Sequence, residues 1–180
     1  MNVKLINCPT PEDWMCVKDR ALVTVGKHAV NPPTSEWKRK ILRARHSPIR
    51  YLRYSFFLEG IPSWVSVHLV RHVHAQPYVR SQRNDRQDMY DRNKAPQDAP
   101  VDMIWDVNVE ELMTIANKRL CMQASEETRN VVKLMCSLAE EATPELCGLL
   151  VPNCVRMGGR CEEMNPCGRW MNNEDMEDWQ

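Results

Sequence analysis

Apolar residues recur every three or four positions between residues 108 and 142, and this spacing predicts the strongest helical region of the chain. The residues that form the stripe are Leu112, Ala116, Leu120, Ala124, Thr128, Val131, Met135 and Leu138. The pattern fits a long helix over 108–142, or two helices with a break near Ser125, and Pro144 ends the helical region.

Two helices nearer the N-terminus are predicted from their first residues. The stretch 10–13, TPED, places a capping hydroxyl before a proline and two acids, which predicts a helix to about residue 23. Thr34 or Ser35 begins a second helix that runs to about Ala44. A third helix is expected from Ser63 to about His74, because apolar residues share one side there at helical spacing.

Strands are expected at residues 2–8 and 51–59, the second of which is rich in aromatic residues. Strands and helices together predict a mixed α+β fold. Residues 80–104 are interpreted as a loop, because arginines alternate with aspartates and Pro96 and Pro100 interrupt regular structure. Such a loop is either a solvated surface segment or, since it continues directly from Arg71-His72, a segment that faces a ligand.

Length and composition indicate one globular domain over residues 1–150, followed by a cysteine-rich tail over 151–180. The chain has 180 residues, of which 43% are hydrophobic and 27% charged, and its net charge is zero. A bound anion must therefore be held by a local cluster rather than by overall charge. No apolar run is long enough to span a membrane, and residues 1–14 do not resemble a signal peptide, so a cytoplasmic protein is expected.

Eight cysteines are many for such a chain, and four of them crowd the end: Cys147, Cys154, Cys161 and Cys167. Disulfides are not expected in a reducing cytosol. The alternatives are a structural metal site, with zinc as the expected metal, and ordinary buried or free thiols. The spacings are wide, and the short C-x-x-C pattern usual in zinc sites is absent.

The chemistry-bearing stretch of the chain is residues 71–83, RHVHAQPYVRSQR. Arg71-His72-Val73 is followed by seven residues and then Ser81, and Arg83 comes two positions later. Arginine forks match phosphate geometry, and a hydroxyl adds a neutral donor, so the stretch predicts an anion pocket. A simpler interpretation of Arg71 is an arginine that meets the dipole at a helix C-terminus.

The same stretch resembles the signature of the flavin-dependent thymidylate synthases, Arg-His-Arg, seven residues, then Ser. Other segments of the family pattern follow in consistent order across residues 46–140: His46-Ser47-Pro48, 54–71, Arg92-x-x-x-Pro96, Trp105-x-x-Asn108 and the helical pattern that begins at Arg119. The sequence departs from the pattern at Val73 and Glu110, where the family has arginines, and its segment between Arg83 and Arg92 is shorter.

The resemblance implies an α+β fold with a mostly antiparallel sheet packed with long helices, and reductive methylation of dUMP to dTMP. It implies that Ser81, Arg83 and Arg92 bind the phosphate of dUMP. Arg119 would lie near the uracil, where a cation stabilises negative charge that develops on the ring. Arg119 and Ser81 are the predicted catalytic residues, and His68, at the position of a family glutamine, is a further substrate contact.

For the cofactor, the resemblance implies FAD, with NADPH and methylenetetrahydrofolate as co-substrates. Arg71, His72, Asn108 and His46 would contact the flavin. The family consists of homotetramers whose active sites are built across subunits. A cofactor of this kind carries the redox chemistry, and the protein supplies binding and orientation, so no cysteine needs to be catalytic.

Two alternatives come from other classes. Val73 and Glu110 favour a diverged relative that binds or modifies a pyrimidine nucleotide without full synthase activity. The arginine-rich segment, together with a cysteine metal knuckle, would fit a nucleic-acid binding module. The zero net charge and the interleaved aspartates argue against nucleic acid.

Overall fold

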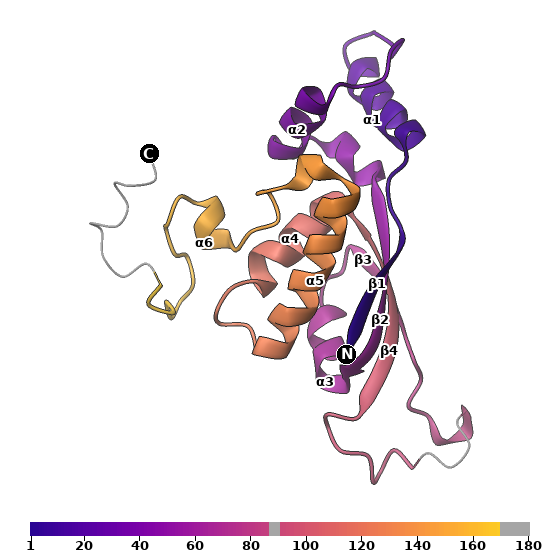
Figure 1. Ribbon diagram of the computed structural model, residues 1–180, viewed down its shortest axis with the longest axis vertical. Helices are drawn as coiled ribbons and strands as arrows, with labels where there is room; N and C mark the ends of the chain where they lie inside the picture. Colours follow the sequence, from indigo (N-terminus) through magenta and orange to yellow (C-terminus); the bar gives the residue numbers. More distant parts are fainter. Residues whose placement is uncertain (87–90, 170–180) are drawn as a thin grey trace.

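A four-stranded antiparallel sheet in the order β1-β2-β4-β3 organises the chain. The structure, a computed structural model, describes residues 1–86 and 91–169. Figure 1 shows α4 and α5 lying along one face of the sheet, with α1 and α2 at its upper end. The mixed α+β fold with an antiparallel sheet is confirmed. The elements are β1 (Asn2–Asn7), α1 (Pro11–Val23), α2 (Ser35–Arg43), η1 (Ser47–Tyr51), β2 (Arg53–Pro62), α3 (Ser63–Leu69), β3 (Ala75–Val79), η2 (Asn84–Arg86), β4 (Pro100–Asn108), α4 (Val109–Arg119), α5 (Glu126–Ala142), η3 (Pro144–Leu146) and α6 (Asn153–Arg156).

The central strand β4 lies partly where the sequence predicted a loop, and that part of the loop prediction is wrong. Along β4 the side chains alternate, with Val101, Met103, Trp105 and Val107 buried on one face. Pro100 does not interrupt the sheet because it is the first residue of the strand, where it pairs with Pro62 at the end of β2.

The N-terminal helices follow their predicted caps. Thr10 and Asp13 form a capping box at the start of α1, and the Thr34 side chain accepts a hydrogen bond from Trp37 N at the start of α2. The third helix is shorter than predicted. It ends at Leu69, and residues 70–74 turn the chain into β3, with His72 N donating to the carbonyl of Leu69.

The region 108–142 forms two helices, so the prediction of one continuous helix is wrong and the alternative break near Ser125 is right. α4 ends at Arg119, and the Ser125 hydroxyl then caps α5 by accepting from Thr128 N. A capping serine favours a new helix start over helix continuation. Its hydroxyl accepts from a backbone N–H in the first turn, which has no carbonyl partner within the helix.

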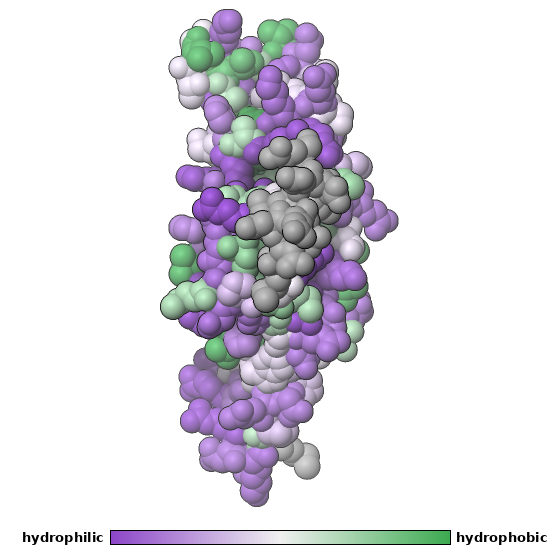
Figure 2. Space-filling model, turned by 90° about the vertical axis from the view of Figure 1, so that its left-hand side faces the viewer, coloured by the Kyte–Doolittle hydropathy of each residue, from purple (hydrophilic) through white to green (hydrophobic). Residues whose placement is uncertain are grey.

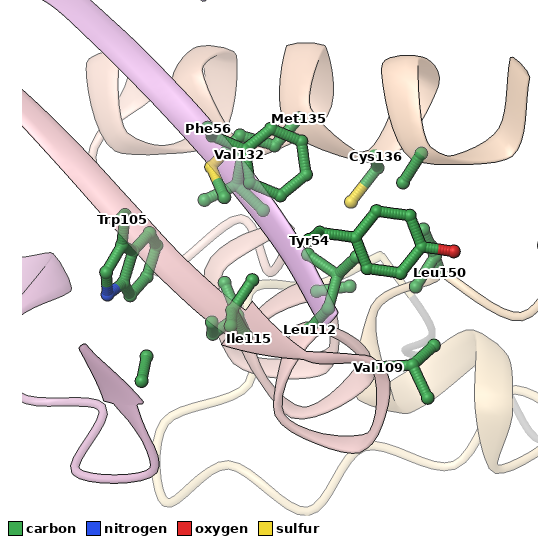
Figure 3. Packing of buried hydrophobic residues seen from close by; sticks show 14 of the residues in the cluster. Tyr54, Phe56, Trp105, Val109, Leu112, Ile115, Val132, Met135, Cys136 and Leu150 are labelled. Atoms are coloured by element: carbon green, nitrogen blue, oxygen red, sulfur yellow. The ribbon is translucent and has the colours of Figure 1, made fainter. Parts of the chain in front are cut away.

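The core lies between the sheet and these two helices. Tyr54 and Phe56 on β2 stack with their ring centroids 6.2 Å apart, and Trp105 on the neighbouring β4 is fully buried beside them (Figure 3). Figure 3 also shows Ile115 from α4 and Met135 from α5 pointing into this layer. No described helix combines the length and apolar character needed to cross a membrane.

Beyond the lower end of the sheet, the connection from β3 to β4 projects away from the helices (Figure 1). In the space-filling view this end of the molecule is almost entirely hydrophilic (Figure 2). The connection carries the predicted phosphate-binding residues Ser81, Arg83 and Arg92. The position of this connection therefore decides whether these three residues can lie near the other predicted site residues.

Candidate functional site

Arg119, in the last turn of α4, is held in a fixed orientation by the turn that follows α3. Its Nε donates to His72 Nε2 at 3.0 Å, and its Nη2 donates to the backbone carbonyl of His68 at 2.8 Å. The α3 helix stops at Leu69, so the chain turns back at this point and presents both acceptors to α4. The guanidinium keeps further N–H groups for a ligand.

His72 connects this arginine to a buried carboxylate. Its Nδ1 lies 3.3 Å from Glu111 Oε1, and the two side chains are only 10% and 7% exposed. Because Nε2 accepts a hydrogen bond from Arg119, the proton of the neutral ring must be on Nδ1, from which it is donated to Glu111. Burial, together with the nearby charges of Arg119 and Arg71, lowers the pKa of His72 to about 4. The ring is therefore neutral at physiological pH.

The charges around His72 respond to burial in the same way. Burial lowers the pKa of the Arg119 guanidinium, and the like charge of Arg71 adds to this effect. Burial raises the pKa of Glu111, while His74 acts in the opposite direction. Glu111 is placed here by the start of α4, where Asn108 caps the helix by accepting from Glu111 N at 3.0 Å.

A cationic pocket of about 410 Å³ opens on the Arg119 side of this chain of contacts. Its polar walls are formed by Arg71, His72, Lys118, Arg119 and Gln123, and Glu163 at its edge lies 3.4 Å from Lys118. Arg71 and Arg119 have no carboxylate partner among the described residues. Two guanidinium groups that share a pocket without a counter-ion suit a bound oxyanion.

A second pocket, of about 430 Å³, opens on the Glu111 side. Its walls are formed by Arg50, His74, Asn108, Glu110, Glu111 and Thr114. Arg50 is paired with Glu110. Glu111 in the acidic pocket contacts His72, and His72 contacts Arg119 in the cationic pocket. The side chains that line the two pockets are therefore held in place by one another.

The predicted site residues fall into two groups. Arg71, His72, Arg119 and the backbone of His68 come together at the cationic pocket, and Asn108 lines the neighbouring pocket. His46 stands apart at the start of η1, where its carbonyl accepts from Ile49 N. The sequence analysis did not identify Glu111, Lys118 or Gln123. Only their distance from Arg119 in the sequence could have pointed to Lys118 and Glu111. Lys118 directly precedes Arg119, and Glu111 lies about two turns before it on α4.

Ser81, Arg83 and Arg92 lie on the connection between β3 and β4, and none of the three lines the cationic pocket. Arg83 pairs with Asp85, and its backbone N–H donates to Ser81 Oγ at 3.3 Å. The Arg92 backbone N–H donates to Asn84. These contacts organise the projecting connection itself (Figure 1). A phosphate site that combines these residues with Arg119 stays a prediction.

The four C-terminal cysteines predicted as zinc ligands are not gathered into a site. Among residues 1–86 and 91–169, no three histidine, cysteine or acidic side chains are placed to hold a metal ion. Cys154, Cys161 and Cys167 line one surface pocket together with Cys121, whereas Cys147 is exposed and its carbonyl accepts from Arg39. Cys147 therefore lies apart from the other three cysteines, and the zinc site stays a prediction.

Comparison with known proteins gives a consistent result. The sequence model of the family described as thymidylate synthase complementing protein matches residues 91–145, which include Arg92, Asn108, Glu111 and Arg119. No curated protein matches the chain.

Solved structures match over most of the chain. The flavin dependent thymidylate synthase ThyX from Helicobacter pylori, complexed with FAD and dUMP, superposes with a TM-score of 0.67 at 15% identity, over 84% of this chain and 100% of that one. A second structure of that enzyme with FAD and dUMP gives 0.60 at 16% identity, over 76% and 92%. The UMP/dUMP methylase PolB from Streptomyces cacaoi, bound with 5-Br dUMP, gives 0.65 at 14% identity, over 82% and 93%.

These matches confirm the resemblance seen in the sequence: the chain has the fold of the flavin-dependent thymidylate synthases and carries a segment that matches the family's sequence model.

Proposed function

We propose that the protein binds a pyrimidine nucleoside monophosphate, with dUMP as the first candidate, and methylates its uracil ring with FAD as cofactor. The observation that carries this proposal is the orientation of Arg119. His72 and the His68 carbonyl fix its guanidinium at a cationic pocket. Arg119 also lies within the segment that matches the family's sequence model.

The residues present fit the cofactor in part. Arg71 and Lys118 supply donors for a pyrophosphate, and Asn108 and Thr114 supply hydrogen-bonding groups for a ring edge. Pockets of about 410 and 430 Å³ each accommodate only part of so large a cofactor, so a second chain has to complete its site. Bound FAD would supply the hydride chemistry, with methylenetetrahydrofolate as carbon donor and NADPH as reductant.

The residues of the chain bind, orient and stabilise charge. Arg119 presents its remaining N–H groups to the pyrimidine, where a fixed cation stabilises negative charge that develops on the ring. The neutral His72 acts as an acceptor for Arg119 and places no additional positive charge beside it. Glu111 keeps the His72 proton on Nδ1, so that Nε2 stays available to Arg119. Arg119 is thus oriented before the nucleotide arrives.

Ser81, Arg83 and Arg92 would hold the nucleotide phosphate from a second copy of the chain. These residues lie on the connection that projects away from the helices, including α4, which carries Arg119 (Figure 1). The resulting oligomer, a tetramer by resemblance, would place the connection of one subunit over the cationic pocket of another. Both a hydroxyl and two guanidinium groups would then reach one dianion.

A second candidate is the modification of another uracil nucleotide. Glu110, at a position where the family has an arginine, pairs with Arg50 and makes its pocket acidic. This change alters the contacts that the pocket can offer to a cofactor or a carbon donor. One of the structural neighbours is a UMP/dUMP methylase, so UMP is the competing substrate to test.

The test is a product assay with purified full-length protein, FAD, NADPH, methylenetetrahydrofolate and either dUMP or UMP. We expect the methylated nucleotide to be detected by chromatography and mass spectrometry, and we expect it to disappear in Arg119→Ala. The side chain of Arg86 is exposed, and Arg86 contacts Arg83 only through its backbone N–H, which an alanine keeps, so Arg86→Ala is the matched control. Absence of product from both nucleotides, with FAD demonstrably bound, would contradict the proposed reaction.

A further inference from the structure

A third pocket, of about 480 Å³, lies between the end of α2, the side of α4 and residues 148–156. It shares no lining residue with the two pockets of the candidate site. Three arginines line it: Arg43, Arg45 and Arg156. Among residues 1–86 and 91–169, no acidic side chain lines it. Its charge is therefore strongly positive, and the nucleotide proposal does not use it.

Arg45 has an unusual backbone conformation. Its φ is +50°, and it is the only described residue other than glycine with a positive φ. It stands just after the C-cap of α2, where Arg45 N donates to the Leu42 carbonyl and His46 N donates to the Ile41 carbonyl. This is the Schellman arrangement, in which glycine is the usual residue because a β-carbon is strained there. The strain of a large residue here suggests that the side chain has a use.

The Arg45 guanidinium is fixed by a neutral partner. It donates to Asn117 Oδ1 at 2.7 Å, and the buried Asn117 is itself anchored by donating from Nδ2 to the Val151 carbonyl at 2.6 Å. Burial lowers the pKa of Arg45, and the like charge of Arg156 lowers it further. Among the described residues, the carboxylate of Glu110 raises the pKa of Arg45 from a distance, and it is paired with Arg50. Arg45 and Arg156 thus share a pocket without a counter-ion.

The rest of the pocket wall is apolar. It consists of Leu42, Met113, Leu149, Val151 and Val155. A site for inorganic phosphate alone would not need such a wall, and a site for a neutral hydrocarbon would not need two neighbouring arginines. Pockets of this size with an apolar wall and a few convergent charged groups bind small organic molecules.

We propose that this pocket binds a small amphiphilic anion, with an oxyanion head on Arg45 and Arg156 and an apolar body against Leu149, Val151 and Val155. The head is a carboxylate or a phosphate monoester, since arginine forks match both geometries. Burial of the body would remove apolar surface from water on both sides. The site is independent of the nucleotide site, so failure of one does not decide the other.

The experiment is a calorimetric titration of the full-length protein with four probes: octanoate, octyl phosphate, the uncharged octanamide and the short acetate. We expect octanoate or octyl phosphate to bind, and the tighter of the two identifies the head group. Octanamide should bind at least about tenfold more weakly because it offers no charge to the arginines. Acetate should also bind at least about tenfold more weakly because it lacks the apolar body.

Arg45→Gly is the sharpest variant, because glycine relieves the backbone strain while it removes the guanidinium. We expect its melting temperature to stay within a few degrees of the wild type, roughly, and its affinity to fall by at least about tenfold. Arg156→Ala should lose affinity as well. Arg160 lies in the same segment but outside the pocket and close to Glu162, so Arg160→Ala should bind normally. Equal binding of octanamide, equal loss in Arg160→Ala, or no binding of either anion would overturn the proposal.

Discussion

At the scale of single residues, His72 is the clearest case in which a structure decides a charge. A histidine beside a glutamate would ordinarily be expected to carry a proton on both ring nitrogens. Here Arg119 donates to Nε2, which leaves only Nδ1 for the proton. The sequence could place His72 next to Arg71 but could not show that α4 brings Glu111 and Arg119 to its two nitrogens. Those contacts depend on how α4 docks against the turn after α3.

We predict that His72 stays neutral down to about pH 5, consistent with a pKa lowered to about 4. The folded-state pKa is below the unfolded value of 6.5, so the unfolded chain binds more protons between these values, and His72 makes folding less stable as pH falls through that window. The pKa of Glu111 is raised in the folded chain, so Glu111 makes folding less stable as pH rises through its titration range. Imidazole NMR, assigned with His72→Gln, measures the titration. A midpoint near 6.5 would contradict the hydrogen-bond assignment.

Tyr54 offers a second prediction at this scale. Its hydroxyl donates to Thr143 Oγ1 at 2.7 Å in a fully buried position, and burial raises its pKa. Tyr54→Phe should lower the free energy of unfolding by about 1–2 kcal/mol, because the Thr143 hydroxyl loses its partner. Tyr78→Phe on β3, where the side chain is exposed, should change it by less than about 0.5 kcal/mol. Urea denaturation compares them, and equal effects would show that the buried hydrogen bond contributes nothing.

At the scale of elements, the helix starts that depend on local hydrogen bonds were predicted from the local sequence. Thr10 and Thr34 predicted the starts of α1 and α2 correctly. Each cap depends only on a hydrogen bond from the backbone N–H three residues later, so the local sequence is sufficient to predict it. β4 was missed because the charged residues and prolines before it hid its alternation. Its exposed-side aspartates have tertiary roles, as when Asp102 accepts from Gly60 N at 2.9 Å across the sheet. Such a contact cannot be seen in the sequence.

The break between α4 and α5 gives a prediction for one element. Ser125 Oγ accepts from Thr128 N and lies 2.9 Å from Thr128 Oγ1, so it fixes the start of α5. Ser125→Ala should lower the free energy of unfolding by about 1 kcal/mol. Ser137→Ala, in the exposed middle of α5, should be neutral or slightly stabilising, because alanine is the better helix former. If both substitutions have the same effect in denaturant unfolding, Ser125 does not define the helix start.

At the scale of the whole molecule, the predicted site residues lie in two parts of the structure. Arg71, His72 and Arg119 line the body, and Ser81, Arg83 and Arg92 lie on the projecting connection (Figure 1). The resemblance predicted both halves, but only the first is assembled by the described contacts. The surroundings of the second half could not be worked out from the sequence, because contacts between distant segments or between separate chains are not a local property.

The proposed assembly predicts complementation between two inactive variants. Arg119→Ala lacks the body half of each site, and Arg83→Ala lacks the connection half. In a mixed oligomer made by co-refolding the two variants, about one quarter of two-chain sites would draw both intact halves. Nucleotide methylation should therefore return to roughly a quarter of the wild-type rate. Activity that stays at the level of the separate variants would contradict a site shared between chains.

The central claim is that Arg119 binds a pyrimidine nucleotide, and calorimetric titration of the full-length protein with dUMP in the presence of FAD tests it most directly. The account predicts measurable binding by the wild type and a loss of about 1.5–3 kcal/mol, roughly tenfold or more in affinity, in Arg119→Ala. Arg86→Ala should bind as the wild type does. No binding by the wild type, or equal small losses in both variants, would contradict the account.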